Sequence, residues 1–180
     1  MKLIILDRDG VINEDSDDFI KSTEEFIPIA GSLEAIARLN QSGYSVAIAT
    51  NQSGIARGLY SLDTLNSMHE KLHRLLAPFG GHIDAIFFCP HGPDAHCECR
   101  KPKIGMFNEI KQRFGIELYD VFAVGDSLRD VQAAQAAGAN PVLVRTGKGE
   151  RTLANGEGIE AVPVFANLAA FVDELLMHEI

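Results

Sequence analysis

Two carboxylates, Asp7 and Asp9, directly follow the apolar run LIIL near the start of the chain. Carboxylates this close together at the end of a buried strand repel each other unless a cation or a shared proton lies between them. An Mg2+ site needs only one or two protein carboxylates, so the pair is predicted to be a nucleophile and a general acid/base beside that metal. A solvated acidic turn is the alternative. A calcium loop counted from Asp7 fits less well, because Val11 stands where it needs Asp or Asn.

Polar residues also follow the second and fourth apolar runs. The segment from Thr50 to Ser53 offers hydroxyl and amide donors, and Gly54 permits a concavity of backbone N–H groups for an anion, although an ordinary polar loop accounts for the same residues. Asp130 falls in a first helical turn, where the helix dipole alone favours a carboxylate. Asp126 stands at a strand tip and is predicted to face the Asp7 loop if the two strands are neighbours.

The segment after the third run contains all three cysteines of the chain and the basic pair Arg100-Lys101. Its four soft donors are Cys89, His91, Cys97 and Cys99. Three thiolates and one imidazole complete a tetrahedral Zn2+ site with no position for water, so the zinc is predicted to be structural and to hold the basic pair in place. Three free cysteines, or His96 in place of His91, are the alternatives. Because thiolates bind Mg2+ poorly, the sequence predicts two metals with separate roles.

The elements that must position these residues can be expected from the apolar runs at 3–6, 44–49, 85–88, 121–124 and 141–144. The runs are near-continuous rather than alternating, which indicates strands buried on both faces of a parallel sheet. Helical patterns lie between and after them at 32–40, 61–76, 105–114, 128–138 and 167–178. The alternation predicts a doubly wound, mainly parallel α/β sheet in one domain spanning 1–180, with 146–158 as a long surface loop. In such a sheet, ligands bind at the carboxyl ends of the strands.

The composition excludes several classes of protein. A net charge of −9 over 180 residues argues against a nucleic-acid partner, because phosphate binding needs a basic face. No apolar run approaches the ~20 residues of a membrane span, and the chain turns acidic too early for a secretory signal. Three clustered cysteines do not form a disulfide framework and indicate the reducing cytoplasm. We expect a cytoplasmic monomer with no membrane partner.

The order of the motifs carries more weight than any one of them. The chain resembles the haloacid dehalogenase-type phosphatases, whose four motifs match Asp7-Arg8-Asp9-Gly10, Thr50, Lys101 and Gly125-Asp126. The match covers nearly the whole length. It implies a Rossmann-like fold with little or no cap and an Mg2+-dependent phosphatase reaction.

A closer resemblance, within the histidinol-phosphatase-like subgroup, is to the D-glycero-D-manno-heptose-1,7-bisphosphate 7-phosphatases. It rests on LDRDGVIN, TNQSGIARG, the Cys/His segment and VGDSLRDVQAA. It implies a small phosphorylated sugar as substrate, structural Zn2+, and a role in supplying heptose for lipopolysaccharide core precursors. Histidinol-phosphate phosphatases share the zinc loop, so that activity is the alternative. A zinc-stabilised phospholigand-binding module is the non-enzyme alternative, against which the intact pair Asp7 and Asp9 argues.

The resemblance also implies residue roles. Asp7 is expected to attack phosphorus, Asp9 to serve as general acid and then base, and Thr50 and Lys101 (rather than Lys103) to stabilise the phosphoryl group. The expected Mg2+ ligands are Asp7, Asp9 through its carbonyl, and Asp126, with Asp130 in support. The expected substrate contacts are Arg8, Asp15, Ser16, Asp17, Asp18, Thr50, Asn51, Gln52, Ser53, Arg57, Arg100 and Lys101, although residues 14–18 can equally form an exposed acidic loop.

One position departs from this pattern. Ser127 stands where many of these enzymes have a lysine that contacts the substrate. That contact is not carried over, and the preferred anomer of the sugar stays open.

Overall fold

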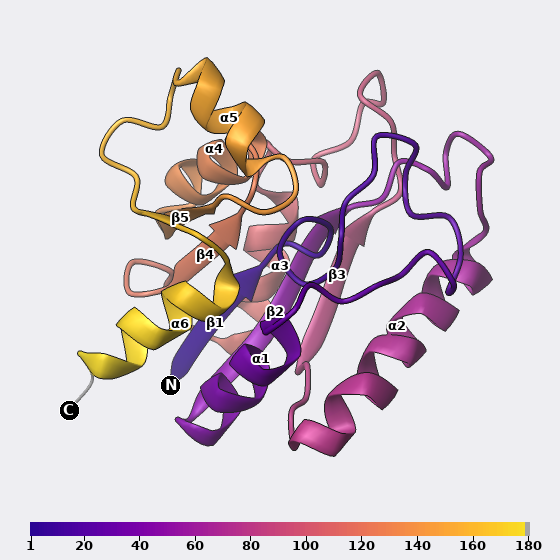
Figure 1. Cartoon of the computed structure of the whole chain (residues 1–180). Helices are drawn as coiled ribbons and strands as arrows, with labels where there is room; N and C mark the ends of the chain where they lie inside the picture. Colours follow the sequence, from indigo (N-terminus) through magenta and orange to yellow (C-terminus); the bar gives the residue numbers. More distant parts are fainter. Residues whose placement is uncertain (179–180) are drawn as a thin grey trace.

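A six-stranded parallel sheet in the order β3-β2-β1-β4-β5-β6 forms the centre of the protein in a computed structural model that describes residues 1–178 (Figure 1). The strands are β1 (Lys2–Leu6), β2 (Tyr44–Asn51), β3 (Ala85–Cys89), β4 (Phe122–Gly125), β5 (Asn140–Val144) and β6 (Val164–Phe165). The five predicted strands are confirmed, with ends shifted by one or two residues. The two-residue strand β6 is too short for an apolar run to reveal it.

Helices cover both faces of this sheet. They are α1 (Ser32–Gln41), α2 (Leu62–Leu76), α3 (Gly105–Phe114), α4 (Leu128–Ala136), α5 (Gly149–Asn155) and α6 (Leu168–Met177), with a 3-10 turn at Ala77–Phe79. Helices α1, α2 and α6 pack on one core, and α3 and α4 on the other. Within β1, Ile4 and Leu6 belong to the first core, whereas Leu3 and Ile5 belong to the second. Burial on both faces is why the strands read as continuous apolar runs.

The strand order reverses between β1 and β4. On one side of β1 the sheet continues with β2 and then β3, and on the other side with β4, β5 and β6. Leu6 is in register with Val124, and the Asp7 N–H donates to the Val124 carbonyl at 2.9 Å. Asp7 and Asp126 therefore leave adjacent strands at the switch point, where open α/β sheets bind their ligands. The predicted doubly wound, parallel sheet is confirmed.

The connection from β1 to α1 forms no cap. Between Asp7 and Gly31 the described chain contains only turns and two isolated bridges, Asp9 with Asn13 and Asn13 with Pro28. The pocket at the sheet edge consequently stays open to solvent without a separate covering domain. Among residues 1–178, no helix combines the length and apolar character needed to cross a membrane.

The prediction that 146–158 is a surface loop is wrong. Residues Gly149–Asn155 form α5, and the segment before it packs onto the switch point. The Thr146 hydroxyl donates to the Gly10 carbonyl at 2.7 Å, and the Thr152 hydroxyl donates to the Asp126 carbonyl at 2.8 Å. A helix of only seven residues in a glycine-rich segment gives little periodicity from which to predict it. Its position is set by these hydrogen bonds to distant residues.

Candidate active site

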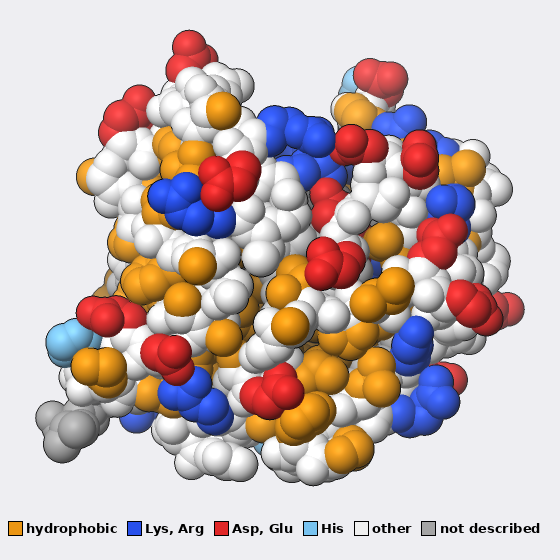
Figure 2. Space-filling view, viewed as in Figure 1, with side chains coloured by type: hydrophobic (Ala, Val, Ile, Leu, Met, Phe, Trp, Pro, Cys, Tyr) orange, Lys and Arg blue, Asp and Glu red, His pale blue; other side chains and the backbone are white. Residues whose placement is uncertain are grey.

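Most of the predicted site residues line one pocket of about 280 Å3 at the carboxyl ends of the strands. Figure 2 shows Lys and Arg side chains gathered with Asp and Glu side chains at the top of the view, above these strand ends. The predicted residues in the lining are Asp7, Asp9, Asp15, Ser16, Asp17, Thr50, Asn51, Gln52, Ser53, Arg57, Arg100, Lys101, Asp126 and Asp130. Asp18 lies outside the lining, exposed, with its N–H donating to the Ser16 hydroxyl.

Three carboxylates converge on the pocket floor. One oxygen each from Asp7, Asp126 and Asp130 lie within 4.8 Å of one another. Burial, together with the charge of Asp130, raises the pKa of Asp7 to about 7. Burial and the charge of Asp7 also raise the pKa of Asp126 well above its usual value. These carboxylates resist being ionised together, and oxygen donors in this number fit Mg2+, which would compensate their charge.

Two glycines leave room for the Asp126 carboxylate. Gly10 has φ +87°, and a Cβ there would lie 2.0 Å from Asp126 Oδ2. Gly147 has φ +58°, and its Cβ would lie 2.3 Å from the same atom. The N–H of Lys148 donates to Asp126 Oδ2 at 2.8 Å. The loops after β1 and β5 thus enclose the carboxylate from two sides, which only glycine permits at both positions.

Lys101 is buried against the same carboxylates. Its Nζ lies 2.6 Å from Asp130 Oδ1 and 3.1 Å from Asp7 Oδ1, and donates to the Ala49 carbonyl at 2.7 Å. Burial opposes its charge, but Asp130 and Asp7 hold the pKa of Lys101 above its usual value. Lys103, by contrast, is exposed and donates to the Cys97 carbonyl. Of the two lysines, Lys101 is the one in the pocket.

The main chain of Lys101 is held by a single amide. Asn51 Oδ1 accepts from the Lys101 N–H at 3.0 Å, and Asn51 Nδ2 donates to the Lys101 carbonyl at 3.2 Å. This pair of bonds fixes the loop after β3 against the end of β2. Asn51 was predicted to contact substrate; it lines the pocket, and its side-chain bonds position the lysine.

Asp130 is bound from both sides. Its Oδ2 accepts from the Asp126 N–H, the Ser127 N–H and the Ser127 hydroxyl at 3.0–3.2 Å, while Oδ1 faces Lys101. Burial alone would raise the pKa of Asp130, but Lys101 and Ser127 lower it below the usual value. A Cβ at Gly125 would lie 2.2 Å from the Asp130 Cβ, so glycine is needed there. Asp130 therefore links Lys101 to the start of α4.

Asp9 presents one oxygen to the pocket and has the other fully engaged. Its Oδ1 accepts from Arg8 Nε at 2.9 Å, Arg8 Nη2 at 2.7 Å and Asn13 Nδ2 at 2.8 Å. Within residues 1–178, its Oδ2 accepts from Gln52 Nε2 alone, at 3.2 Å. Oδ2 is thus the oxygen with capacity to exchange a proton.

The Arg8 side chain, predicted as a substrate contact, points away from the pocket. Arg8 is 0% exposed and is absent from the pocket lining. Its guanidinium lies over the Phe26 ring, with Nη1 3.6 Å from Met68 Sδ and 3.3 Å from His69 Nε2. Burial lowers the pKa of His69 to about 3, so the neutral ring accepts from Arg8. Arg8 therefore orients the Asp9 carboxylate from the side that faces away from the pocket.

Two ion pairs connect the acidic loop to the segment around α5. Lys148 Nζ lies 2.5 Å from Asp15 Oδ2, and Arg151 Nη1 lies 3.2 Å from Asp17 Oδ1. The hydrogen bond and charge of Asp15 outweigh burial and raise the pKa of Lys148, so it stays protonated. Lys148 lines the pocket and was not predicted, because its distance of 22 residues from Asp126 in the sequence hides their contact.

Three guanidiniums line the pocket wall: Arg57, Arg100 and Arg129. Burial and then repulsion by Arg129 lower the pKa of Arg100. In residues 1–178, none of the three pairs with a carboxylate. Arg57 donates to the Ser53 hydroxyl and Arg100 to the His91 carbonyl. Unpaired cations facing one cavity are suited to an anionic group of a ligand. Arg129 was not predicted.

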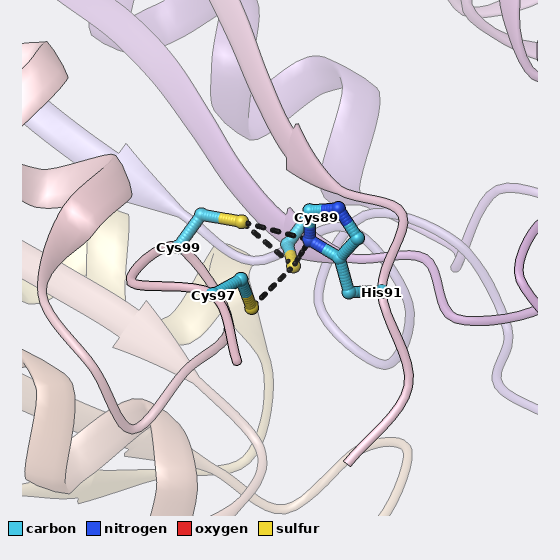
Figure 3. Close-up of side chains that lie close together, drawn as sticks. All are labelled: Cys89, His91, Cys97 and Cys99. Carbon is cyan, nitrogen blue, oxygen red and sulfur yellow. Dashed lines mark hydrogen bonds between the residues drawn. The ribbon is translucent and has the colours of Figure 1, made fainter. Parts of the chain in front are cut away.

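The four soft donors converge at the end of β3, as Figure 3 shows. Cys89 Sγ lies 2.9 Å from Cys99 Sγ, 3.9 Å from Cys97 Sγ and 3.5 Å from His91 Nδ1. The four atoms lie within 4.8 Å of one another and match the donor set of a structural Zn2+ site. His96 is exposed and outside this cluster, so His91 is the histidine that the fold brings in. The cluster ends two residues before Lys101.

Comparisons with known proteins agree with this geometry. A family model described as HAD-hydrolase-like matches residues 98–171. D-glycero-beta-D-manno-heptose-1,7-bisphosphate 7-phosphatases are 58% identical in Bordetella bronchiseptica, covering 99% of both chains, and 57% identical in Pseudomonas putida, covering 98% of this chain and 100% of the relative. The chain belongs to this phosphatase family.

A solved structure of a family member supports the same fold. The crystal structure of D,D-heptose 1,7-bisphosphate phosphatase from B. bronchiseptica, complexed with magnesium and phosphate, has a TM-score of 0.96. It is 58% identical and covers 98% of this chain and 99% of that one. The resemblance predicted from the motifs, the phosphatase class and the α/β fold are therefore confirmed.

Proposed function

We propose that the protein removes the 7-phosphate of D-glycero-β-D-manno-heptose 1,7-bisphosphate in an Mg2+-dependent reaction, for the supply of lipopolysaccharide core precursors. The observation that carries the proposal is the pocket itself. Asp7, Asp126 and Lys101 meet at its floor, and a wall of unpaired guanidiniums faces them. The names of the most similar relatives above support the β anomer and support the heptose substrate over histidinol phosphate.

Asp7 is the proposed nucleophile. Its carboxylate attacks phosphorus to give an aspartyl-phosphate, which divides a difficult displacement into two easier steps. Lys101 Nζ, 3.1 Å from Asp7 Oδ1, stands where it stabilises negative charge on the phosphoryl oxygens, and the Thr50 hydroxyl gives a second donor at the end of β2. The bonds from Asn51 and Asp130 hold the lysine in place before the substrate arrives.

Asp9 is the proposed general acid and base. Its Oδ2 delivers a proton to the leaving sugar oxygen and then removes one from the water that hydrolyses the aspartyl-phosphate. Arg8 and Asn13 occupy Oδ1 and fix the plane of the carboxyl group. The side chain therefore needs no reorganisation between the two steps.

Both metals fit their donor sets. Asp7, the Asp9 carbonyl and Asp126 would hold Mg2+, with Asp130 in support, and the ion supplies charge neutralisation between an anionic nucleophile and an anionic phosphate. The Cys89, His91, Cys97 and Cys99 set would hold Zn2+ without an open position, as a structural element next to Arg100 and Lys101. Three thiolates are consistent with the cytoplasm, and we propose a monomer acting as one domain.

The wall of guanidiniums supports a substrate with two phosphates. While one phosphate occupies the floor, the other meets Arg57, Arg100 and Arg129, where a planar cation binds phosphate oxygens in pairs. Histidinol phosphate has no second phosphate for this wall to bind, and its ammonium group adds a positive charge that the guanidiniums repel. The same charges thus favour one candidate substrate and disfavour the other.

The test is phosphate release from both anomers of heptose 1,7-bisphosphate and from histidinol phosphate, with and without Mg2+. We expect the β anomer to give the highest kcat/KM, the 1-phosphate to remain in the product by 31P NMR, and Asp7→Asn to abolish turnover. Faster hydrolysis of histidinol phosphate contradicts the assignment. Turnover no higher than that of Asp7→Asn supports a binding module instead.

A further inference from the structure

Gln52, which was predicted to contact the substrate, lines the pocket, but both of its amide hydrogens and one lone pair of its amide oxygen are already bonded within the protein. Gln52 is 3% exposed. Its Nε2 donates to Thr50 Oγ1 at 2.9 Å and to Asp9 Oδ2 at 3.2 Å, and its Oε1 accepts from the Tyr60 hydroxyl at 2.5 Å. A primary amide has two hydrogens to donate, so none is left for a ligand.

The orientation of this amide follows from its neighbours. In its ionised state Asp9 only accepts hydrogen bonds, so in that state the group that faces its Oδ2 is the NH2 of Gln52 and not the carbonyl. The carbonyl then faces Tyr60, which must donate. Burial raises the pKa of Tyr60 to about 12, so the phenol keeps that hydrogen at any working pH.

Thr50 is consequently left with a hydrogen of its own. Its oxygen already accepts from Gln52, and the other contact of the hydroxyl, with the Asn51 carbonyl, is long at 3.5 Å. Thr50 is 1% exposed yet lines the pocket. The hydroxyl hydrogen therefore has one direction in which a strong acceptor can arrive, namely a phosphoryl oxygen above the pocket floor.

The sequence makes space for the tyrosine that completes this arrangement. A Cβ at Gly54 would lie 2.2 Å from Tyr60 Cε1, so glycine lets the ring pack against the loop. The Leu59 N–H donates to the Gly54 carbonyl at 2.9 Å and closes residues 54–59 into a turn. The Gln52 N–H donates to the Cys89 carbonyl at 2.7 Å, which fixes the main chain beneath the amide.

We propose that Gln52 is a positioning residue, locked by the Tyr60 hydroxyl, that turns the Thr50 hydroxyl toward the transferring phosphoryl group. The inference rests on the proposed phosphatase function. Loss of the Tyr60 hydroxyl releases the amide to rotate, and Thr50 then loses its preferred donor direction. Because the phosphoryl group gains this donor fully only when its oxygens are placed for transfer, the effect falls on kcat more than on KM.

The test uses Tyr60→Phe, which keeps the ring against Gly54 and removes only the hydroxyl. Tyr119→Phe is the matched control, because Tyr119 is 70% exposed and is not among the residues that line the pocket. With p-nitrophenyl phosphate as substrate, we expect Tyr60→Phe to lower kcat about tenfold with KM changed less than twofold, and Tyr119→Phe to match the parent enzyme. Equal kcat values for the two variants overturn the proposal.

A double-mutant cycle with Thr50→Val separates positioning from general damage. Thr50→Val removes the hydroxyl that Gln52 is proposed to orient, so Tyr60→Phe should have little further effect on kcat in that background. Two effects that multiply in full contradict the proposal. Gln52→Met keeps the side-chain length without the amide and should reproduce Tyr60→Phe or exceed it, whereas a Gln52→Met variant with parental kcat contradicts it.

A spectroscopic measurement gives an answer independent of turnover. In the parent protein the side-chain amide hydrogens of Gln52 should exchange slowly with water, since both are bonded and buried. Tyr60→Phe should accelerate that exchange at least tenfold, with the thermal midpoint within a few degrees of the parent. An unchanged exchange rate of the Gln52 amide hydrogens in Tyr60→Phe would contradict the proposal that the Tyr60 hydroxyl holds the amide in place. Failure of heptose bisphosphate as a substrate contradicts the proposed function alone and leaves these comparisons valid.

Discussion

Lys101→Met is the most informative single change, because the structure gives it a matched control two residues away. The substitution keeps the length of the aliphatic chain and removes the ammonium group. Lys101 Nζ contacts Asp130, Asp7 and the Ala49 carbonyl within 2.6–3.1 Å, and its side chain is 4% exposed. Lys103 has the same side chain on the other side of Pro102, but it is exposed and donates to one carbonyl.

Two magnitudes follow for Lys101→Met. Removing one partner of a buried ion pair typically costs about 3–5 kcal/mol in the free energy of unfolding, because the other charge is left uncompensated. Removing one preorganised donor at a transferring group costs about 10²–10³ in rate. We therefore expect a folded protein that is less stable by ~3 kcal/mol or more, with kcat lower by at least ~10².

The assay is phosphate release at saturating Mg2+, beside urea unfolding followed by circular dichroism, for Lys101→Met and Lys103→Met. Lys103→Met should keep kcat within about twofold and stability within ~0.5 kcal/mol, as surface substitutions usually do. If Lys101→Met retains more than a tenth of the parental kcat, Lys101 does not stabilise the phosphoryl group. If Lys103→Met is equally impaired, the reasoning from burial and contacts fails.

Three further changes test other parts of the site. Cys97→Ser should release Zn2+, measured by metal analysis, and lower kcat while Mg2+ affinity by calorimetry stays within a few fold; an equal loss of both would refute the separate roles of the metals. Lys148→Met should raise KM for the heptose substrate severalfold, whereas Arg151→Met, which breaks only an exposed ion pair, should leave KM nearly unchanged; equal effects would contradict a role in binding. Gly125→Ala should reduce both kcat and thermal stability, because its Cβ would overlap the Asp130 side chain; a crystal structure with Asp130 unmoved would contradict this.

The chain order of the motifs made the floor of the site predictable. Asp7 and Asp126 each follow a continuous apolar run, and parallel strands bring their carboxyl ends to one edge whatever the loops do. The proximity of Cys89 and His91 was also predictable, because residues two positions apart in a short loop cannot lie far from each other. These features depend on periodicity and proximity in sequence, which are local properties.

The direction of individual side chains was decided only by the tertiary structure. Arg8 and Gln52 stand in the predicted loops, yet both side chains bond to residues inside the protein. Arg8 packs against Phe26 and Met68. Gln52 accepts a hydrogen bond from Tyr60, whose ring packs beside Gly54. No local pattern encodes partners that lie many residues away.

Long-range packing likewise determined the last wall of the pocket. The sequence by itself predicted the sheet, the order of its motifs and the cluster of four soft donors. Only the fold brought Lys148 to the carboxylate of Asp126, through two glycines that let main chains approach within reach of a hydrogen bond. The physical reason is that a strand fixes where a residue emerges, whereas packing against distant residues fixes which way its side chain points.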